Sequence, residues 1–248
     1  MRHVVRMSPH LSLHTSLRDC ALFLDIDGTL LDFSASPGEV VVPPGLAATL
    51  RALQSQHGGA LAFISGRSLA DIEALFGSTI AFGAEHGAFL RTADGTVIFE
   101  TPRDPTLAEI THELRQAITA YPGVLLEEKR YGVTVHWRAA PAAAQAIGAL
   151  LRAVIAPYPR LALLPAHEAL EVRMSGVNKA AALETFMKHP PFAGRLPIFI
   201  GDDVTDEPAI ALASALGGRG LHVARDFGGR PQAVRDWLTE SVADVTSV

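Results

Sequence analysis

The first part of the chain alternates short apolar runs with amphipathic stretches. Continuous apolar runs at 21–24, 60–64 and 80–82 are typical of parallel strands that are buried on both faces. Leucines at helical spacing follow the first run, and Ser68 with Asp71 marks the start of a helix after the second. This rhythm predicts an open parallel sheet with helices on both faces.

The middle of the chain has a different pattern. Helical periodicity over 107–118 precedes two stretches of period two, 124–130 and 132–138, and a tight turn joins these into a predicted antiparallel hairpin. A second helix and two further short strands follow at 141–155, 161–164 and 169–173. We therefore expect an αββαββ insert with an antiparallel sheet of its own.

The earlier pattern returns near Asn178. A helix, a buried strand at 196–200 and a further helix at 208–216 continue the α/β core, and the stretches 221–224 and 233–238 are expected to complete the wound sheet. The predicted fold class is α/β, with a Rossmann-like wound parallel sheet core and an inserted α+β (αββαββ) domain. The predicted divisions are an N-terminal tail at 1–18, a core domain at 19–101 and 175–248, and the insert at 102–174.

Composition favours a folded protein with a sizeable core. Of the 248 residues, 48% are apolar and 19% charged, which argues against intrinsic disorder. The net charge of −5 is opposite in sign to that of a typical nucleic-acid-binding protein. A single cysteine, Cys20, excludes an internal disulfide and a cysteine-rich zinc site.

The chain shows neither a membrane span nor a secretion signal. Its richest apolar stretch, 139–158, is interrupted by Gln145, Arg152 and two prolines. The N-terminal stretch lacks the continuous apolar region that a secretion signal needs. We expect a cytoplasmic monomer that has no membrane or nucleic-acid partner.

Polar clusters follow the predicted core strands or open the helix after the insert. In a wound parallel sheet the functional crevice lies beyond the carboxyl ends of the strands, so we expect these clusters to converge on one site. The clusters are Asp25-Ile26-Asp27, Ser65-Gly66-Arg67, Lys179, and Gly201-Asp202-Asp203-Val204-Thr205-Asp206-Glu207.

The residue types in these clusters suit phosphoryl chemistry. Clustered carboxylates repel one another unless a cation or proton compensates, and oxygen ligands without clustered His or Cys favour Mg²⁺. Asp25 can attack phosphorus to form an aspartyl-phosphate, and Asp27 is placed to protonate the leaving oxygen and later to deprotonate the hydrolytic water. Ser65, the Gly66 amide and Lys179 would donate to the phosphoryl oxygens.

These motifs resemble those of the haloacid dehalogenase-like phosphatase superfamily, and the insert resembles its cap, which covers the site and selects the substrate. Within the superfamily, the chain is most similar to the trehalose-6-phosphate phosphatase family. The matching stretches are Ile64-Ser65-Gly66-Arg67-Ser68, His86-Gly87, Glu127-x-Lys129, Val135-His136-Trp137-Arg138, Glu171-Val172-Arg173, Asn178-Lys179 and Gly201 to Glu207.

The resemblance implies hydrolysis of trehalose 6-phosphate to trehalose and phosphate, a step of trehalose biosynthesis, with Mg²⁺ as cofactor and a small sugar phosphate as partner. It implies the nucleophile and acid/base roles for Asp25 and Asp27. It also implies that Asp25, the carbonyl oxygen of Asp27 and Asp202 hold the metal, while Asp203 and Asp206 support it.

One face of the predicted insert sheet is dense in donors and acceptors, which suits sugar hydroxyls. Any half-exposed antiparallel sheet alternates in this way, and the resemblance is what favours sugar binding. The expected substrate-binding residues, including those bordering the cleft, are Glu85, His86, Glu127, Lys129, His136, Arg138, Glu171, Arg173 and Asn178.

Alternatives stay open at this point. The substrate could be another sugar phosphate, such as sucrose 6-phosphate or mannosyl-3-phosphoglycerate. A non-catalytic phosphoacceptor module also uses an acidic cluster, Mg²⁺ and a lysine, but such modules have no large insert. A catalytically silent sugar-binding protein is disfavoured because every reacting group is present.

The chain departs from the family pattern in a few places. Met174 stands where the family usually has Pro, and Ala180 and Ala84 stand where it tends to have Gly. The segment 225–248 matches the family poorly, and we assign no function to it.

Overall fold

The computed structural model describes residues 19–32, 40–166 and 168–244 of the chain, so the predicted N-terminal tail lies outside the described residues. The chain divides into two compact units. The first unit contains residues up to 61 together with those from 187 onward, and the second unit contains residues 62–186.

A parallel sheet forms the centre of the first unit. Strand β10 (Leu196–Gly201) pairs with β1 (Cys20–Leu24) on one side and with β11 (Arg219–His222) on the other. All five residues of β1 are buried, as their uninterrupted apolar character predicts for a strand covered on both faces. The helices of this unit are α1 (Leu46–Gln56), α6 (Glu207–Ala215), α7 (Val223–Asp226) and α8 (Pro231–Asp244).

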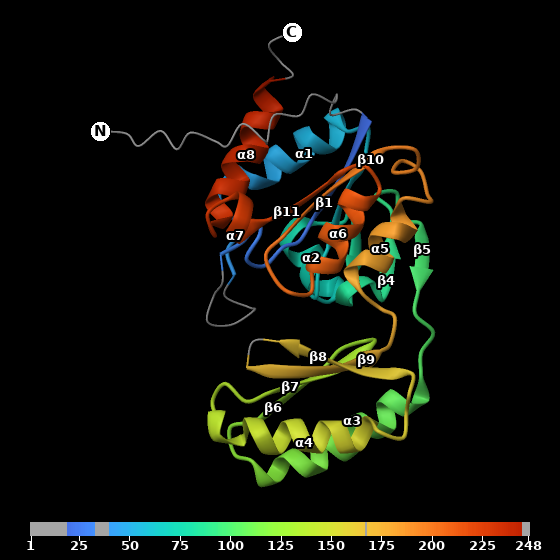
Figure 1. Cartoon of the computed structure of the whole chain (residues 1–248), viewed down its shortest axis with the longest axis vertical. Helices are drawn as coiled ribbons and strands as arrows, with labels where there is room; N and C mark the ends of the chain where they lie inside the picture. Colours follow the sequence, from blue (N-terminus) through green and yellow to red (C-terminus); the bar gives the residue numbers. More distant parts are fainter. Residues whose placement is uncertain (1–18, 33–39, 167, 245–248) are drawn as a thin grey trace, which may run out of the picture. The chain divides into compact units, whose positions relative to one another are not determined.

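Only the first of the two stretches expected to complete the wound sheet contributes to a strand. The stretch 233–238 lies inside helix α8, because its buried residues Val234, Trp237 and Leu238 recur at helical and not at strand spacing. Helix α8 lies beside α1 (Figure 1), where the Gln56 amide donates to the carbonyl oxygen of Val242 at 3.1 Å.

In the second unit, one sheet has both parallel and antiparallel pairs. Strands β2 (Leu61–Ile64) and β3 (Ala81–Ala84) are parallel, as predicted, and helices α2 (Leu69–Phe76) and α5 (Lys179–Phe186) belong to the same unit. Two further strands, β4 (Phe89–Arg91) and β5 (Val97–Glu100), pair antiparallel beyond β3 and were not predicted. They are short, and β5 is largely exposed, so neither has a clear apolar period.

The αββαββ pattern is confirmed in the rest of this unit. The antiparallel sheet has the order β6-β7-β9-β8, and the hairpin β6–β7 closes where predicted. Its elements are α3 (Pro105–Ala117), β6 (Leu125–Glu128), β7 (Gly132–His136), α4 (Ala144–Ile155), β8 (Leu161–Ala166) and β9 (Ala169–Met174). Short 3₁₀ turns follow α3 at Ile118–Ala120 and precede α4 at Pro141–Ala143.

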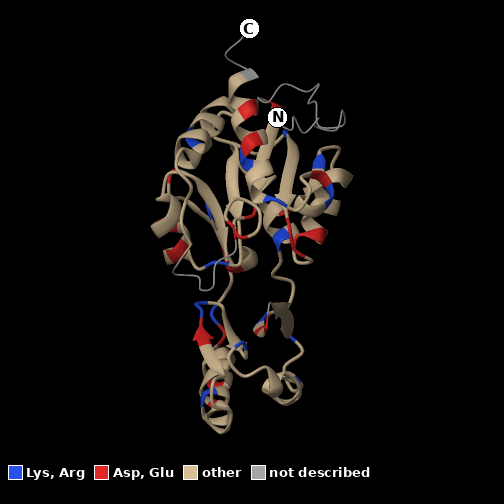
Figure 2. Ribbon diagram, turned by 90° about the vertical axis from the view of Figure 1, so that its left-hand side faces the viewer, with Lys and Arg blue, Asp and Glu red and all other residues tan. Residues whose placement is uncertain are grey.

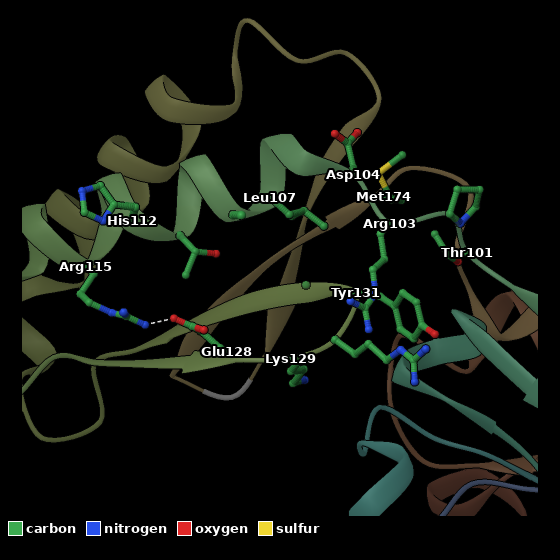
Figure 3. A pocket seen from close by; sticks show the side chains of 15 residues that line it. Thr101, Arg103, Asp104, Leu107, His112, Arg115, Glu128, Lys129, Tyr131 and Met174 are labelled. Atoms are coloured by element: carbon green, nitrogen blue, oxygen red, sulfur yellow. Dashed lines mark ion pairs between the residues drawn. The ribbon is translucent and has the colours of Figure 1, made fainter.

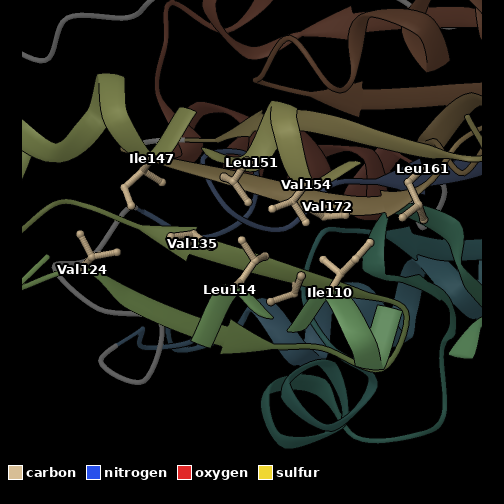
Figure 4. Close-up of a cluster of buried hydrophobic side chains, with 10 residues drawn as sticks. Ile110, Leu114, Val124, Val135, Ile147, Leu151, Val154, Leu161 and Val172 are labelled. Atoms are coloured by element: carbon tan, nitrogen blue, oxygen red, sulfur yellow. The ribbon is translucent and has the colours of Figure 1, made fainter. Parts of the chain in front are cut away.

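Helices α3 and α4 pack on one face of this sheet around an apolar cluster (Figure 4), which includes Leu114, Val135, Leu151 and Val172. Because apolar side chains fill that face, the alternating polar side chains are left on the other. The α/β fold class is therefore as predicted. The domain boundaries near 101 and 175 stay a prediction, since the insert shares its compact unit with β3, β4 and α5.

Among the described residues, no helix has both the length and the apolar character that crossing a membrane requires.

Candidate active site

Three aspartates of the first unit come together beyond the carboxyl ends of β1 and β10. Asp25, Asp202 and Asp206 each offer a carboxylate oxygen, and these oxygens lie within 4.8 Å of one another. Asp25 and Asp206 are buried, and Asp202 is half-buried. Carboxylates at this separation repel one another unless a cation or a proton compensates, and a donor set made only of oxygen fits a hard ion such as Mg²⁺.

A tight turn after β10 positions Asp206. One oxygen of its carboxylate accepts the backbone N–H groups of Asp202 and Asp203, each at 3.1 Å. Gly201 is required here, because a Cβ atom at that position would lie 2.3 Å from Cγ of Asp206. Thr29 also donates to Asp202 at 3.2 Å. Each of these groups is close enough to fix the orientation of a carboxylate.

The other two aspartates of the predicted metal site, Asp203 and Asp27, are not part of this group of three carboxylates. Asp203 is exposed, and its carboxylate accepts the N–H of Val204 at 2.6 Å. Asp27 is half-buried, in the turn that follows β1. The group of three carboxylates therefore contains Asp206, which the sequence placed in a supporting role, while Asp27 was assigned to the metal only through its carbonyl oxygen.

The residues predicted to bind phosphate in the second unit lie at element ends, where Ser65 and Lys179 are buried and Gly66 is half-buried. Ser65 directly follows β2, and its hydroxyl accepts the N–H of Arg67 at 3.2 Å. Gly66 lies against the imidazole ring of His86, with room for no side chain. Lys179, only 3% exposed, is the first residue of α5. All three are held in place by the fold around them.

A buried carboxylate brings several predicted substrate-binding residues together. Glu171 of β9 is 3% exposed and accepts a hydrogen bond from Nζ of Lys129 at 2.7 Å. Thr134 donates to the same oxygen at 3.3 Å, and Nε2 of His86 lies 4.0 Å from it. Nζ of Lys129 also lies 3.4 Å from the carbonyl oxygen of Gly66. Strands β7 and β9 and the loops after β2 and β3 thus contribute to one polar group.

Two buried nitrogen atoms at this polar group make no hydrogen bond within the described residues. Nδ1 of His86 and one terminal nitrogen of Arg173 are buried and lack a hydrogen-bond partner among the described residues. Burial, followed by the nearby charges of Lys179, Arg173 and Lys129, holds the pKa of His86 well below its ordinary value. A neutral imidazole beside an unsatisfied guanidinium suits a ligand rich in hydroxyl groups.

Three further predicted residues lie along the same sheet. Glu127 and His136 form a hydrogen bond of 2.8 Å, and this bond lowers the pKa of Glu127. Arg138 donates to Glu168 at 2.9 Å. Across the strands, Glu127 is in register with Thr134, which is in register with Glu171. These side chains are more exposed than Glu171 and border the buried group.

The structure gives Asn178 and Glu85 contacts that the sequence did not predict. The carbonyl oxygen of the Asn178 side chain accepts the N–H of Ala181 at 2.8 Å and so caps helix α5. Glu85 is buried, which raises its pKa, and its carboxylate accepts backbone N–H groups of the β6–β7 turn. The Asn178 contact is a local N-cap, whereas the Glu85 contact depends on tertiary placement and no local motif signals it.

A cavity of about 540 Å³ lies within the second unit (Figure 3). It is lined by 101–104, by helix α3 and by the hairpin residues 128–132, with Met174 at its edge. Its charged side chains largely pair with one another or with neighbours, as in the ion pair between Arg115 and Glu128. No pattern in the sequence indicates this cavity.

Comparison with solved structures identifies the fold as that of haloacid dehalogenase-like hydrolases. A Plasmodium vivax protein described as a HAD/COF-like hydrolase matches with a TM-score of 0.59 at 14% identity, over 92% of this chain and 96% of that one. The C-terminal domain of Candida albicans trehalose-6-phosphate phosphatase matches with a TM-score of 0.77 at 20% identity, over 91% of this chain and 92% of that one.

The sequence comparisons narrow this class. Residues 23–223 match the model of the trehalose-phosphatase family. The trehalose-6-phosphate phosphatase of Escherichia coli (strain K12) is 36% identical over 229 residues, which cover 92% of this chain and 84% of that protein. The chain therefore belongs to the trehalose-phosphatase family and is a phosphatase.

Proposed function

We propose that the chain hydrolyses trehalose 6-phosphate to trehalose and phosphate with Mg²⁺, through a phosphorylated Asp25. The observation that carries this proposal is the group of three carboxylates, Asp25, Asp202 and Asp206, within a chain of the trehalose-phosphatase family. The group has the donors that a divalent cation requires, and it includes a buried carboxylate at the end of β1 that can act as nucleophile.

In the first step, a carboxylate oxygen of Asp25 attacks phosphorus, and the bond between phosphorus and the sugar oxygen breaks. Asp27 gives its proton to the leaving oxygen, which departs as the hydroxyl group of trehalose. In the second step, Asp27 takes a proton from a water molecule, which attacks phosphorus. Phosphate leaves and the Asp25 carboxylate is restored, so the residues return to their starting state.

Asp25, Asp202 and the carbonyl oxygen of Asp27 would hold Mg²⁺, with Asp206 close enough to join or support them. When bound, the ion neutralises the carboxylates and the phosphate charge and orients the phosphoryl group. Asp203 would act from outside the carboxylate group, consistent with its exposed position.

The second unit would supply the phosphate and sugar contacts. Ser65, the amide of Gly66 and Lys179 would bind the phosphoryl oxygens. The sugar would meet a polar group whose buried members include unsatisfied nitrogens of two side chains. We assign to the sugar His86, Lys129, Glu171 and Arg173, with Glu127, His136 and Arg138 at the border. Residues 102–174 would act as the cap domain.

The identity of the sugar rests on these cap residues. Sucrose 6-phosphate and mannosyl-3-phosphoglycerate would require the same phosphoryl chemistry at Asp25 and differ only in their sugar contacts. A phosphoacceptor module is disfavoured by membership of a phosphatase family. The cytoplasmic location and the monomeric state stay predictions.

Phosphate release tests the proposal directly. The protein is assayed with Mg²⁺ on trehalose 6-phosphate, sucrose 6-phosphate, glucose 6-phosphate and mannosyl-3-phosphoglycerate, each with an EDTA control. We expect EDTA-sensitive release from trehalose 6-phosphate alone, and its loss in the folded Asp25→Asn variant. Release from a different sugar would change the substrate and keep the chemistry. If the Asp25→Asn variant kept more than roughly a few per cent of the wild-type activity, Asp25 would not be the nucleophile.

A further inference from the structure

The turn of the β6–β7 hairpin is anchored by a buried carboxylate from another part of the second unit. Glu85, 4% exposed, accepts the backbone N–H of Arg130 through one oxygen at 3.1 Å and that of Tyr131 through the other at 2.9 Å. Both oxygens of the carboxylate thus bind the same two-residue turn. A carboxylate that accepts two N–H groups makes strong, directional bonds, which fix the backbone and not only a side chain.

A second carboxylate holds the side chains of the same turn. Glu100, at the end of β5, accepts hydrogen bonds from Arg130 at 2.6 Å and from the hydroxyl group of Tyr131 at 2.7 Å. Arg130 also lies over the ring of Phe89, 5.9 Å from its centroid. The turn is therefore held through its backbone on the buried side and through its side chains on the more exposed side.

Lys129 is the residue directly before this anchored pair. Its backbone N–H donates to the carbonyl oxygen of Gly132 at 3.0 Å, which closes the hairpin. Its Nζ reaches Glu171 and the carbonyl oxygen of Gly66, and its side chain is 11% exposed. The acidic end of β6 and the basic turn adjoin in Figure 2. Because the turn backbone is fixed one residue away, it determines where the Lys129 side chain begins.

The backbone at Glu85 has an uncommon conformation that this contact explains. Glu85 and His86 have φ angles of +46° and +59°, in the left-handed region that non-glycine residues seldom adopt. In this conformation the side chains of Glu85 and His86 point to different partners. Glu85 meets the hairpin turn, while His86 packs on Gly66 and lies near Glu171.

We propose that Glu85 is a positioning residue for the phosphatase reaction, which fixes the β6–β7 turn and thereby the substrate contact of Lys129. This inference rests on the proposed function of Lys129 as a sugar ligand. It differs from the sequence-based expectation that Glu85 borders the substrate itself. Its role is confined to binding and leaves the chemistry at Asp25 unaffected.

A double-mutant cycle tests whether Glu85 acts through Lys129. Glu85→Gln retains an oxygen for one N–H but sets an amide NH₂ against the other. We expect KM for trehalose 6-phosphate to rise about tenfold, with kcat changed by less than about twofold. In the Lys129→Ala background, we expect Glu85→Gln to have almost no further effect on KM. Glu85→Asp, which keeps both carboxylate oxygens, should recover part of the loss.

Two controls separate this role from a general loss of folding. Glu128→Gln makes the same chemical change on the same hairpin, at a carboxylate that pairs with Arg115 of α3, and should leave KM unchanged. Turnover of p-nitrophenyl phosphate, which has no sugar, should be close to wild type in Glu128→Gln, and in Glu85→Gln it should fall much less than turnover of trehalose 6-phosphate. Circular dichroism would establish that each variant is folded.

The outcomes are distinguishable. Additive effects of Glu85→Gln and Lys129→Ala would overturn the proposal and assign Glu85 a separate contact with the substrate. Equal losses on p-nitrophenyl phosphate would also overturn it, in favour of a structural role. If wild type is active on trehalose 6-phosphate but Lys129→Ala has no effect, the role of Lys129 fails together with this inference. If wild type instead acts only on another sugar, the substrate assignment fails, and the same cycle run on that sugar decides the role of Glu85.

Discussion

Gly66 and His86 are packed so closely that a Cβ atom at position 66 would lie 2.6 Å from Nε2 of the imidazole. The ring cannot move away freely, because His86 is mostly buried and its backbone is held by a hydrogen bond from its N–H to the carbonyl oxygen of Ser65 at 2.8 Å. The predicted phosphate-binding loop after β2 and the residue that faces Glu171 therefore share one surface of contact.

Gly66→Ala should consequently lower stability and activity together. Overpacking of this kind costs about 1–3 kcal/mol of the free energy of unfolding. Urea denaturation and turnover of trehalose 6-phosphate would measure the two effects. Gly148→Ala in helix α4 is the matched control, since its nearest neighbour is the flexible end of Arg152 at 3.4 Å. A Gly66→Ala protein as stable as this control would contradict the packing argument.

Gly201→Ala should disrupt the carboxylate group, because the new methyl group would displace Asp206. We expect the affinity for Mg²⁺ to fall about tenfold or more, since Asp206 orients the backbone of two neighbouring aspartates. Isothermal titration with Mg²⁺ and the Mg²⁺ dependence of turnover would both report the change. Asp226→Asn, in the same unit, should bind the metal like wild type. An unchanged affinity in Gly201→Ala would show that Asp206 does not matter for the metal.

His86 should make stability depend on pH below neutrality. Its pKa in the folded protein is held well below the ordinary value by burial and nearby cations, whereas in the unfolded chain its pKa is about 6.5. As pH falls below that value, the unfolded chain takes up a proton that the folded protein does not. The free energy of unfolding should therefore decrease, by at most about 1.4 kcal/mol per pH unit for this group.

Denaturation of wild type and His86→Gln at several values between about pH 7.5 and about pH 5 would test this sign. The variant should lose less stability on acidification than wild type. His112→Gln, at an exposed histidine of α3, should follow wild type. The argument fails if the His86→Gln and wild-type curves run parallel over this range.

Glu171→Ala should impair recognition of the sugar more than the chemistry. The change removes the buried acceptor of Lys129 and leaves that ammonium group without its closest carboxylate. We expect kcat/KM for trehalose 6-phosphate to fall about a hundredfold and that for p-nitrophenyl phosphate to change by less than about threefold. Glu113→Gln, at an exposed residue of α3, serves as control. Equal losses on both substrates would argue against a role in recognising the sugar.

Sequence patterns predicted the parts of this protein that depend on local periodicity. The buried run of β1 and the β6–β7 hairpin formed as expected, because burial on two faces or on one face leaves a direct pattern of apolar residues. Strands β4 and β5 were missed, since they are too short and exposed to show a period. The stretch 233–238 was expected in the sheet but is helical, because its buried residues recur at helical spacing.

The candidate site shows the same division. Its residue types were predictable, and the structure brings Lys129 and Glu171 together and places Asp25 beside Asp202. The contacts of Glu85 and Glu100 could not be predicted. Each joins residues about thirty or more positions apart, through a backbone N–H or a tyrosine hydroxyl group, and no sequence motif marks such a contact. Tertiary contacts of this type become visible only when the chain is folded.

The anchoring of the hairpin turn bears on how substrate preference can be exchanged between related enzymes. A chimaera that replaces 102–174 would bring in a new Lys129 and a new Glu171 but would keep the host residues at 85 and 100. The transplanted turn would then meet carboxylates selected for another hairpin. If Lys129 binds the sugar as proposed, Glu85 and Glu100 would have to be exchanged together with 102–174, although they lie outside that segment.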